Sequence, residues 1–295
     1  MKNFLGFFFL LFVLACSSEK VALNDVQNEV VVENTLNPSG SYSYFYGGQN
    51  RTYYYYQPSN LIENAPLLFV LHGYNSNVED FMRMFPMQEL ADEYGFALVY
   101  PQGLKENTGR THWNAGLTLS DVDDVGFLSQ LAQQLQDTYQ LNPDKTFTSG
   151  YSNGGFMSYE LIVNRPDIFK AAASISGTMS LATWNNRFEA EPLPILQLSG
   201  ALDRIVPVNG LSNLYGGWGG APEISEIMVF WAELNQANFQ EISEQDETTI
   251  TKYINQESGN EVWYYLIENL DHGIPMGINY NVNAPSLIWD FFSNY

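Results

Sequence analysis

The stretch Thr146–Tyr159, TFTSGYSNGGFMSY, begins with a pattern typical of a β-strand and ends with one typical of a helix. Ser152 lies between glycines at the corner that joins the two. One interpretation is a flexible loop, and the other is a strained turn that presents the serine as a nucleophile. The flanking glycines favour the second, because a side chain would clash in so tight a turn. The helix that starts here also places partial positive charge beside the hydroxyl.

Strands and helices alternate on both sides of this stretch. Apolar runs typical of buried parallel strands lie at 66–71, 96–100, 145–149, 171–175, 194–198 and 262–267. Helical patterns lie at 78–94, 121–139, 153–164, 223–237 and 284–292, and an antiparallel hairpin is predicted at 41–46 and 51–57. We therefore expect an α/β fold: a mostly parallel central sheet with an N-terminal antiparallel hairpin and helices on both faces.

The composition fits one globular domain, because hydrophobic residues make up 45% and charged residues 15% of the 295 residues. The formal net charge is −21. A nucleic-acid backbone would be repelled by such a surface, so we expect no nucleic-acid partner.

The beginning of the chain predicts export. The apolar run 4–15, FLGFFFLLFVLA, follows Lys2 and is shorter than the roughly 20 residues that span a membrane, so it suits the core of a signal peptide. Cys16, the only cysteine, follows Val13-Leu14-Ala15 as in a bacterial lipobox, where export is followed by diacylation of the cysteine and then by cleavage of the chain before it. The alternative is an ordinary signal peptide with a chance cysteine.

These patterns predict three regions. They are a signal peptide at 1–15, a lipidated N-terminus with a flexible tether at 16–40, and a single catalytic α/β domain at 41–295. We expect an exported protein that is anchored to the membrane of the cell envelope or surface by its lipid alone, or a secreted one.

Residues that follow parallel strands gather at one edge of a sheet, so they are candidates for a functional site. A serine hydroxyl needs a base, and His272 is the one histidine that comes after both Ser152 and the last predicted strand. The known chain order of serine, acid and histidine then places the acid between them. Asp203, directly after the strand 194–198 and its Ser-Gly-Ala-Leu turn, fits this position. The pattern predicts Ser152 as nucleophile, Asp203 as acid and His272 as base.

Alternatives remain for two of these residues. Asp271 competes for the role of acid, although the side chains of neighbouring residues usually point apart. Asp203 would otherwise cap a helix or a turn, and His272 would be a structural or surface histidine.

Two backbone N–H donors are needed to stabilise an oxyanion. Asn153, directly after the serine, and Tyr74, after the turn His72-Gly73, are the predicted donors. His72 precedes the serine and suits this loop better than the role of base, and His112 lies in an irregular loop.

Several segments together resemble the polyhydroxybutyrate depolymerase and feruloyl esterase-like branch of the α/β-hydrolases. They are PLLFVLHGYNSNVEDF (66–81), FALVYPQG (96–103), WNAG (113–116), DVDDVGFL (121–128), GYSNGGFMSYEL (150–161), LSGALDRIVP (198–207) and DHGIPMG (271–277). The hairpin GGQNRTYYYYQP (47–58) resembles the entry strands of that family. The matches run in order from Gly47 to the C-terminus, so they imply an α/β-hydrolase fold.

The resemblance implies the same roles for Ser152, Asp203 and His272, and an oxyanion hole formed by Tyr74 and Asn153. It also implies that Trp113 lines the acyl or aryl pocket, with ordinary core packing as the alternative, and that residues 123–127 cap the helix before the elbow. No cofactor and no metal are expected.

The expected function is a serine esterase that works through an acyl-enzyme. Its substrates would be feruloyl or acetyl esters of plant polysaccharides, or hydroxyalkanoate oligomers. Two other classes stay open: a serine peptidase on the same fold, and a non-catalytic lipoprotein that binds glycans. The presence of all three triad candidates argues against the second.

Overall fold

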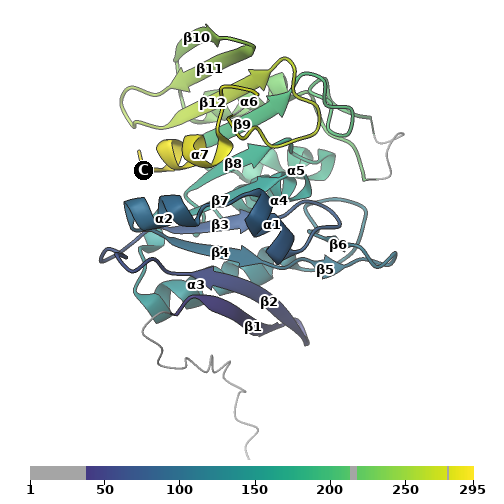
Figure 1. Cartoon of the computed structure of the whole chain (residues 1–295). Helices are drawn as coiled ribbons and strands as arrows, with labels where there is room; N and C mark the ends of the chain where they lie inside the picture. The colour runs from purple at the N-terminus through teal and green to yellow at the C-terminus, as the bar shows by residue number, and fades with distance from the viewer. Residues whose placement is uncertain (1–37, 213–217, 278) are drawn as a thin grey trace, which may run out of the picture.

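Ten strands form one twisted sheet in the computed structural model, which describes residues 38–212, 218–277 and 279–295 (Figure 1). The order across the sheet is β1 (Gly40–Tyr46), β2 (Gln49–Tyr56), β4 (Ala97–Pro101), β3 (Leu67–Leu71), β7 (Thr146–Tyr151), β8 (Ala171–Ile175), β9 (Ile195–Gly200), β12 (Glu261–Ile267), β11 (Thr248–Ile254) and β10 (Phe239–Gln245). The strands from β4 to β12 in this order are mutually parallel, and antiparallel strands flank them on both sides. The carboxyl ends of the parallel strands therefore meet at one edge.

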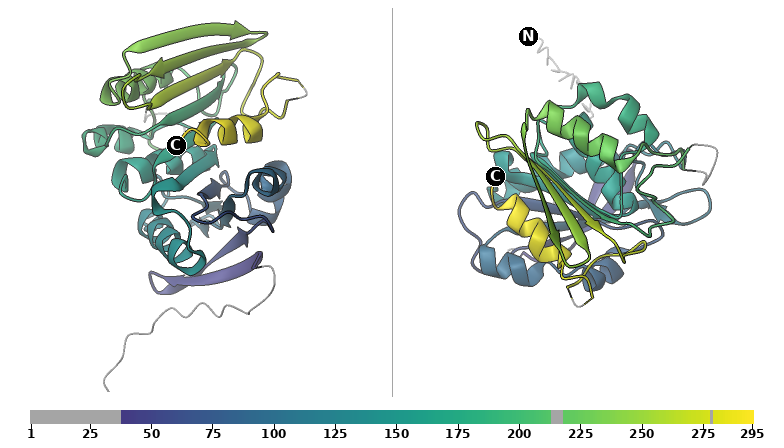
Figure 2. Two further views of the ribbon diagram at one scale, coloured as in Figure 1. Left: turned by 90° about the vertical axis from the view of Figure 1, so that its left-hand side faces the viewer. Right: turned by 90° about the horizontal axis from the view of Figure 1, so that it is seen from above.

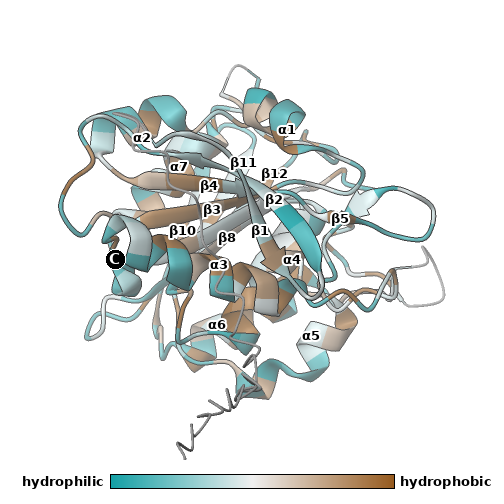
Figure 3. Cartoon of the chain, turned by 90° about the horizontal axis from the view of Figure 1, so that it is seen from below, coloured by the Kyte–Doolittle hydropathy of each residue, from teal (hydrophilic) through white to brown (hydrophobic). Residues whose placement is uncertain are grey.

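Helices cover both faces of the sheet (Figure 2). One face packs against α3 (Asp124–Tyr139), α4 (Asn153–Asn164) and α6 (Ile224–Leu234), with the short α5 (Leu181–Asn185) beside α4. The other face packs against α1 (Val78–Met84), α2 (Gln88–Tyr94) and α7 (Ala284–Phe292). The central strands β3 and β4 are strongly hydrophobic, whereas α1 and α2 include many hydrophilic residues (Figure 3). A sheet buried on both faces explains why its strands read as continuous apolar runs.

The predicted fold class is confirmed, with corrections in detail. The helical pattern at 78–94 is two helices, because Pro86 lacks an N–H donor and breaks the helix between α1 and α2. The pattern at 121–139 becomes helical only at Asp124, and Asp123 caps α3 by accepting a hydrogen bond from the Gly126 N–H. The hairpin of β10 and β11 and the two-residue strands β5 (Leu104–Lys105) and β6 (Thr111–His112) are not anticipated from the sequence.

The tight backbone packing at the corner between β7 and α4 explains why this corner contains glycines. Ser152 has φ 51° and ψ −118°, a backbone conformation that residues other than glycine rarely adopt. A Cβ on Gly150 would lie 2.2 Å from the Gly154 carbonyl, and a Cβ on Gly154 would lie 2.1 Å from the Leu71 carbonyl oxygen. Only glycine lets α4 start this close to β7 and β3, so the turn is rigid rather than a flexible loop.

The predictions for the N-terminus fall outside the described residues. They are the signal peptide at 1–15, the lipidated Cys16 and most of the tether. Within the described part, no helix has the length and apolar character needed to cross a membrane.

Candidate active site

Ser152, His272 and Asp203 lie in one hydrogen-bonded chain, although they are far apart in sequence. His272 Nε2 is 2.9 Å from Ser152 Oγ, and His272 Nδ1 is 2.7 Å from Asp203 Oδ2. A carboxylate can only accept, so Nδ1 carries the ring proton in this arrangement and Nε2 can accept the serine proton. Each residue follows the carboxyl end of a parallel strand: Ser152 follows β7, Asp203 follows β9 and His272 follows β12.

The second oxygen of Asp203 fixes the carboxylate. Asp203 Oδ1 accepts hydrogen bonds from the backbone N–H groups of Ile205 and Val206, both at 2.8 Å, and the side chain is buried. The competing acid Asp271 accepts a hydrogen bond from the His272 backbone N–H at 2.9 Å instead. Asp203 is therefore the aspartate that binds the imidazole ring, whereas Asp271 binds a backbone N–H group.

Two hydroxyl groups hold the loop that carries His272. The Tyr151 hydroxyl donates to the His272 carbonyl at 3.2 Å, and the rings of these residues lie 5.3 Å apart. Ser176 Oγ donates to the Gly273 carbonyl at 2.8 Å. Burial raises the pKa of Tyr151 to about 12, so its hydroxyl keeps its proton at neutral pH. The sequence patterns give no signal for either residue, apart from the place of Tyr151 beside the serine.

A cavity of about 280 Å³ opens beside Ser152. The described residues that line it are Tyr74, Arg110, Leu117, Leu119, Ser152, Asn153, Phe156, Ile205, Val206 and Trp218. The predicted oxyanion donors Tyr74 and Asn153 are thus both at the cavity with the serine. Their backbone N–H groups make no hydrogen bond to any other described residue, so both can bind an oxygen placed there.

The loop that carries Tyr74 is held by His72. His72 Nδ1 donates to the Gly73 carbonyl at 2.7 Å, and Nε2 accepts from the Gly103 N–H at 2.9 Å. Burial lowers the pKa of His72 to about 4, so the ring is neutral. His72 therefore positions the loop and does not act as a base.

Trp113 lies beneath this loop rather than on the wall of the cavity. Its ring is fully buried, packs 5.0 Å from the His72 ring and donates from Nε1 to the His72 carbonyl at 2.9 Å. The Asn153 side chain accepts from the Trp113 N–H at 2.7 Å and donates to its carbonyl at 3.0 Å. The structure thus favours packing for Trp113, which links the two oxyanion donor segments.

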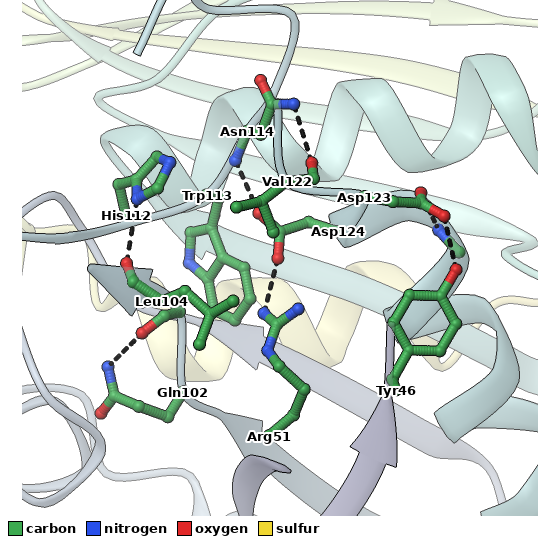
Figure 4. A network of polar contacts seen from close by, with 12 residues as sticks. Tyr46, Arg51, Gln102, Leu104, His112, Trp113, Asn114, Val122, Asp123 and Asp124 are labelled. Carbon is green, nitrogen blue, oxygen red and sulfur yellow. Dashed lines mark hydrogen bonds and ion pairs between the residues drawn. The ribbon is translucent and has the colours of Figure 1, made fainter. Parts of the chain in front are cut away.

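A polar network supports the segment around Trp113 from the other side (Figure 4). Asp124, at the start of α3, accepts from the Asn114 N–H at 2.7 Å and forms a buried ion pair with Arg51 at 2.5 Å. The Arg51 guanidinium also lies 3.9 Å from the centre of the Phe127 ring. This network confirms that residues 123–127 have a structural role. His112 belongs to the same region and is bound to the Leu104 carbonyl and the Ser120 hydroxyl.

The sheet order and a serine on a strand-to-helix corner are those of the α/β-hydrolase fold. Solved structures agree: the acetyl xylan esterase from Aspergillus awamori matches with a TM-score of 0.60 at 16% identity, over 90% of this chain and 98% of that one. The Bacillus cereus carboxylesterase matches with a TM-score of 0.54 at 15% identity, over 83% and 95%.

Residues 51–185 match the family model described as Esterase PHB depolymerase. The bifunctional acetylxylan esterase/xylanase XynS20E of Neocallimastix patriciarum is 30% identical over 54% of this chain and 22% of its own length. Feruloyl esterase B of Talaromyces funiculosus is 26% identical over 42% and 35%. The comparisons thus support a likeness to the polyhydroxybutyrate depolymerase and feruloyl esterase-like family. It spans less than half the length of the curated relatives it matches.

Proposed function

We propose that this protein is a serine esterase that hydrolyses carboxylic esters through an acyl-enzyme. The observation that carries the proposal is the hydrogen-bonded chain from Ser152 through His272 to Asp203, beside a cavity with two unpaired backbone N–H groups. The names of its relatives, which include acetylxylan and feruloyl esterases, support the same chemistry.

The reaction begins when His272 Nε2 takes the proton of Ser152 and Oγ attacks the ester carbonyl. The N–H groups of Tyr74 and Asn153 bind the oxyanion, and each such donor contributes about 3 kcal/mol to the stability of the transition state. Asp203 stabilises the imidazolium that forms. His272 then protonates the leaving alcohol, and a water molecule repeats the sequence to release the acid.

The proposed substrates are acyl or aryl esters released from or attached to extracellular polymers: feruloyl or acetyl polysaccharide esters, or hydroxyalkanoate oligomers. The walls of the cavity favour a small apolar acyl or aryl group, because Leu117, Phe156 and Val206 are among its lining residues. A polymer chain would have to stay outside a cavity of about 280 Å³.

A fluorophosphonate probe tests the mechanism directly. We expect labelling of the wild-type protein and none of Ser152→Ala, with matching loss of activity toward 4-nitrophenyl acetate. Absence of labelling and of turnover in the wild type would overturn the proposal. A panel of methyl ferulate, 4-nitrophenyl acetate, hydroxybutyrate oligomers and an aminoacyl-nitroanilide then separates the ester classes from a peptidase.

The N-terminus supports a proposal about location: export by residues 1–15 and lipid anchoring at Cys16. Expression of the full chain in a bacterial host with labelled palmitate tests it. We expect labelled protein in the membrane fraction, and unlabelled protein when Cys16 is replaced by serine. Equal membrane recovery of both proteins without labelling would contradict the anchor.

A further inference from the structure

The cavity beside Ser152 carries a positive charge. Arg110 is the one ionisable side chain with a formal charge at neutral pH among its described lining residues. The others are apolar or carry neutral polar groups, and the chain as a whole has a formal net charge of −21. A cation at this place in so acidic a protein needs an explanation.

The backbone around Arg110 is fixed by the hairpin of β5 and β6. The Glu106 N–H donates to the Arg110 carbonyl at 2.9 Å, and the Arg110 N–H donates to Glu106 Oε1 at 3.3 Å. The guanidinium carbon lies 6.0 Å from the centre of the Tyr74 ring. Arg110 also lines the same cavity as Ser152 and the two predicted oxyanion donor residues, so a substrate bound there can reach it.

The guanidinium has no carboxylate partner among the described residues, because no Asp or Glu there lies within 4.0 Å of it. The Glu106 carboxylate is close in sequence, but it accepts from the Thr108 N–H at 2.7 Å, the Thr108 hydroxyl and the Tyr74 hydroxyl at 3.1 Å. The donors of Arg110 are therefore available to a group bound in the cavity.

We propose that Arg110 binds a carboxylate carried by the ester substrate, so that the site prefers acidic esters over neutral ones. The inference rests on the proposed esterase function. A guanidinium binds a carboxylate through two parallel hydrogen bonds, which fixes the orientation of the substrate as well as its charge. The formal net charge of −21 weakens long-range attraction of an anionic substrate. Recognition therefore depends on direct contact.

The carboxylate can belong to either half of the ester. On the acyl side it would make the substrate a half-ester of a dicarboxylic acid. On the alcohol side it would make the leaving group a hydroxy acid, such as a uronic acid or the free end of a hydroxyacid oligomer. Two matched pairs distinguish these sources: mono-4-nitrophenyl succinate with 4-nitrophenyl butyrate, and 4-acetoxybenzoate with its methyl ester.

The experiment compares kcat/KM for each pair in the wild type, Arg110→Gln, Arg110→Lys and Lys105→Gln. Lys105 is the matched control, since it lies exposed on the same hairpin, loses the same charge and is not among the described lining residues. We expect Arg110→Gln to lower the anionic-to-neutral ratio of kcat/KM for one pair about tenfold or more. Arg110→Lys should lower this ratio by a smaller factor, and Lys105→Gln should leave it almost unchanged.

Different failures have different meanings. If Arg110→Gln lowers anionic and neutral turnover equally, or if Lys105→Gln changes the ratio as much, specific carboxylate binding is overturned while the esterase function stands. If the wild type hydrolyses no ester, both proposals fall together. Turnover of the neutral esters also reports that each variant is folded.

Discussion

Ser152 holds a backbone conformation that costs on the order of 1–3 kcal/mol, so its surroundings must enforce it. Its N–H donates to the Ile175 carbonyl at 2.8 Å, and its carbonyl accepts from the Gly155 N–H at 2.8 Å. The pattern of glycines around the serine predicts this turn from sequence alone. The acid is different, because Asp203 and Asp271 both follow the ends of predicted strands, and only coordinates show which one meets the imidazole ring.

The first prediction separates these two acids. Asp203→Asn keeps the hydrogen bonds from Ile205 and Val206 but removes the charge and the preference for the proton on Nδ1, so kcat should fall about 10⁴-fold. Asp271→Asn is the control and should retain most of the activity, since that carboxylate binds a backbone N–H. The measurement is steady-state hydrolysis of 4-nitrophenyl acetate. Equal losses in both variants would contradict the assignment.

The second prediction concerns pH and His72. The folded protein keeps this ring neutral, with a pKa of about 4, whereas the unfolded chain takes up the proton near pH 6.5. Below pH 6.5 the unfolded state binds more protons, so the free energy of unfolding falls as pH decreases toward 4. This residue should account for a loss of about 2 kcal/mol between pH 7 and pH 5.

Urea unfolding of the wild type and His72→Gln at both pH values measures this contribution. The variant should show a shallower pH dependence, whatever its stability at pH 7. Parallel pH profiles for the two proteins would show that the ring is not a buried neutral base.

At the scale of elements, helix α4 and the segment 112–114 are joined by the Asn153 side chain. The amide accepts from the Trp113 N–H and donates to its carbonyl, while the Trp113 ring holds the His72 carbonyl. The two proposed oxyanion donors are therefore parts of one rigid assembly. The sequence leaves Trp113 undecided between the pocket and the core, because an aromatic residue suits both and only the position of its ring separates them.

The third prediction tests this assembly. Asn153→Ala keeps the backbone donor but removes both side-chain hydrogen bonds, so kcat should fall about tenfold or more while KM changes little. Asn164→Ala, at the other end of the same helix, removes hydrogen bonds to Glu160 alone and should leave kcat unchanged. If Asn153→Ala raises KM and leaves kcat unchanged, the side chain serves ground-state binding instead.

The extent of prediction at this scale follows from burial. The central strands are apolar on both faces, so their apolar sequence runs are easy to recognise. In contrast, β10 is exposed along its whole length, and β11 has both buried and partly buried residues. Their hairpin therefore lacks the hydrophobic signal that marks the others. Pro86 is a signal in the sequence for a break in the helix. The apolar helical pattern nevertheless continues across it, because α1 and α2 pack against the same face of the sheet. Arg110 has no motif, and only the cavity reveals its position.

For the whole molecule, the charge is the dominant feature beyond the fold. Thirty-three acidic and 12 basic side chains give the formal net charge of −21. Mutual repulsion of this excess destabilises the compact state, and dissolved ions screen it.

The fourth prediction follows from this screening. Sodium chloride between about 10 mM and 300 mM should raise the Tm at pH 7, since the Debye length falls from roughly 30 Å to below 8 Å. Thermal unfolding followed by circular dichroism measures the effect. The rise should be smaller at pH 5, where carboxylates begin to bind protons. A Tm that stays flat or falls with salt at pH 7 would contradict it.

The strand β12 pairs with β9 on one side and β11 on the other, and His272 follows it in the sequence. Synthesis proceeds from the N-terminus, so the proposed nucleophile Ser152 and the proposed acid Asp203 leave the ribosome before the proposed base His272. Until β12 emerges, β9 has an open edge and the imidazole is missing. A nascent chain that has not yet emerged past β12 would therefore lack the proposed base and stay chemically inert.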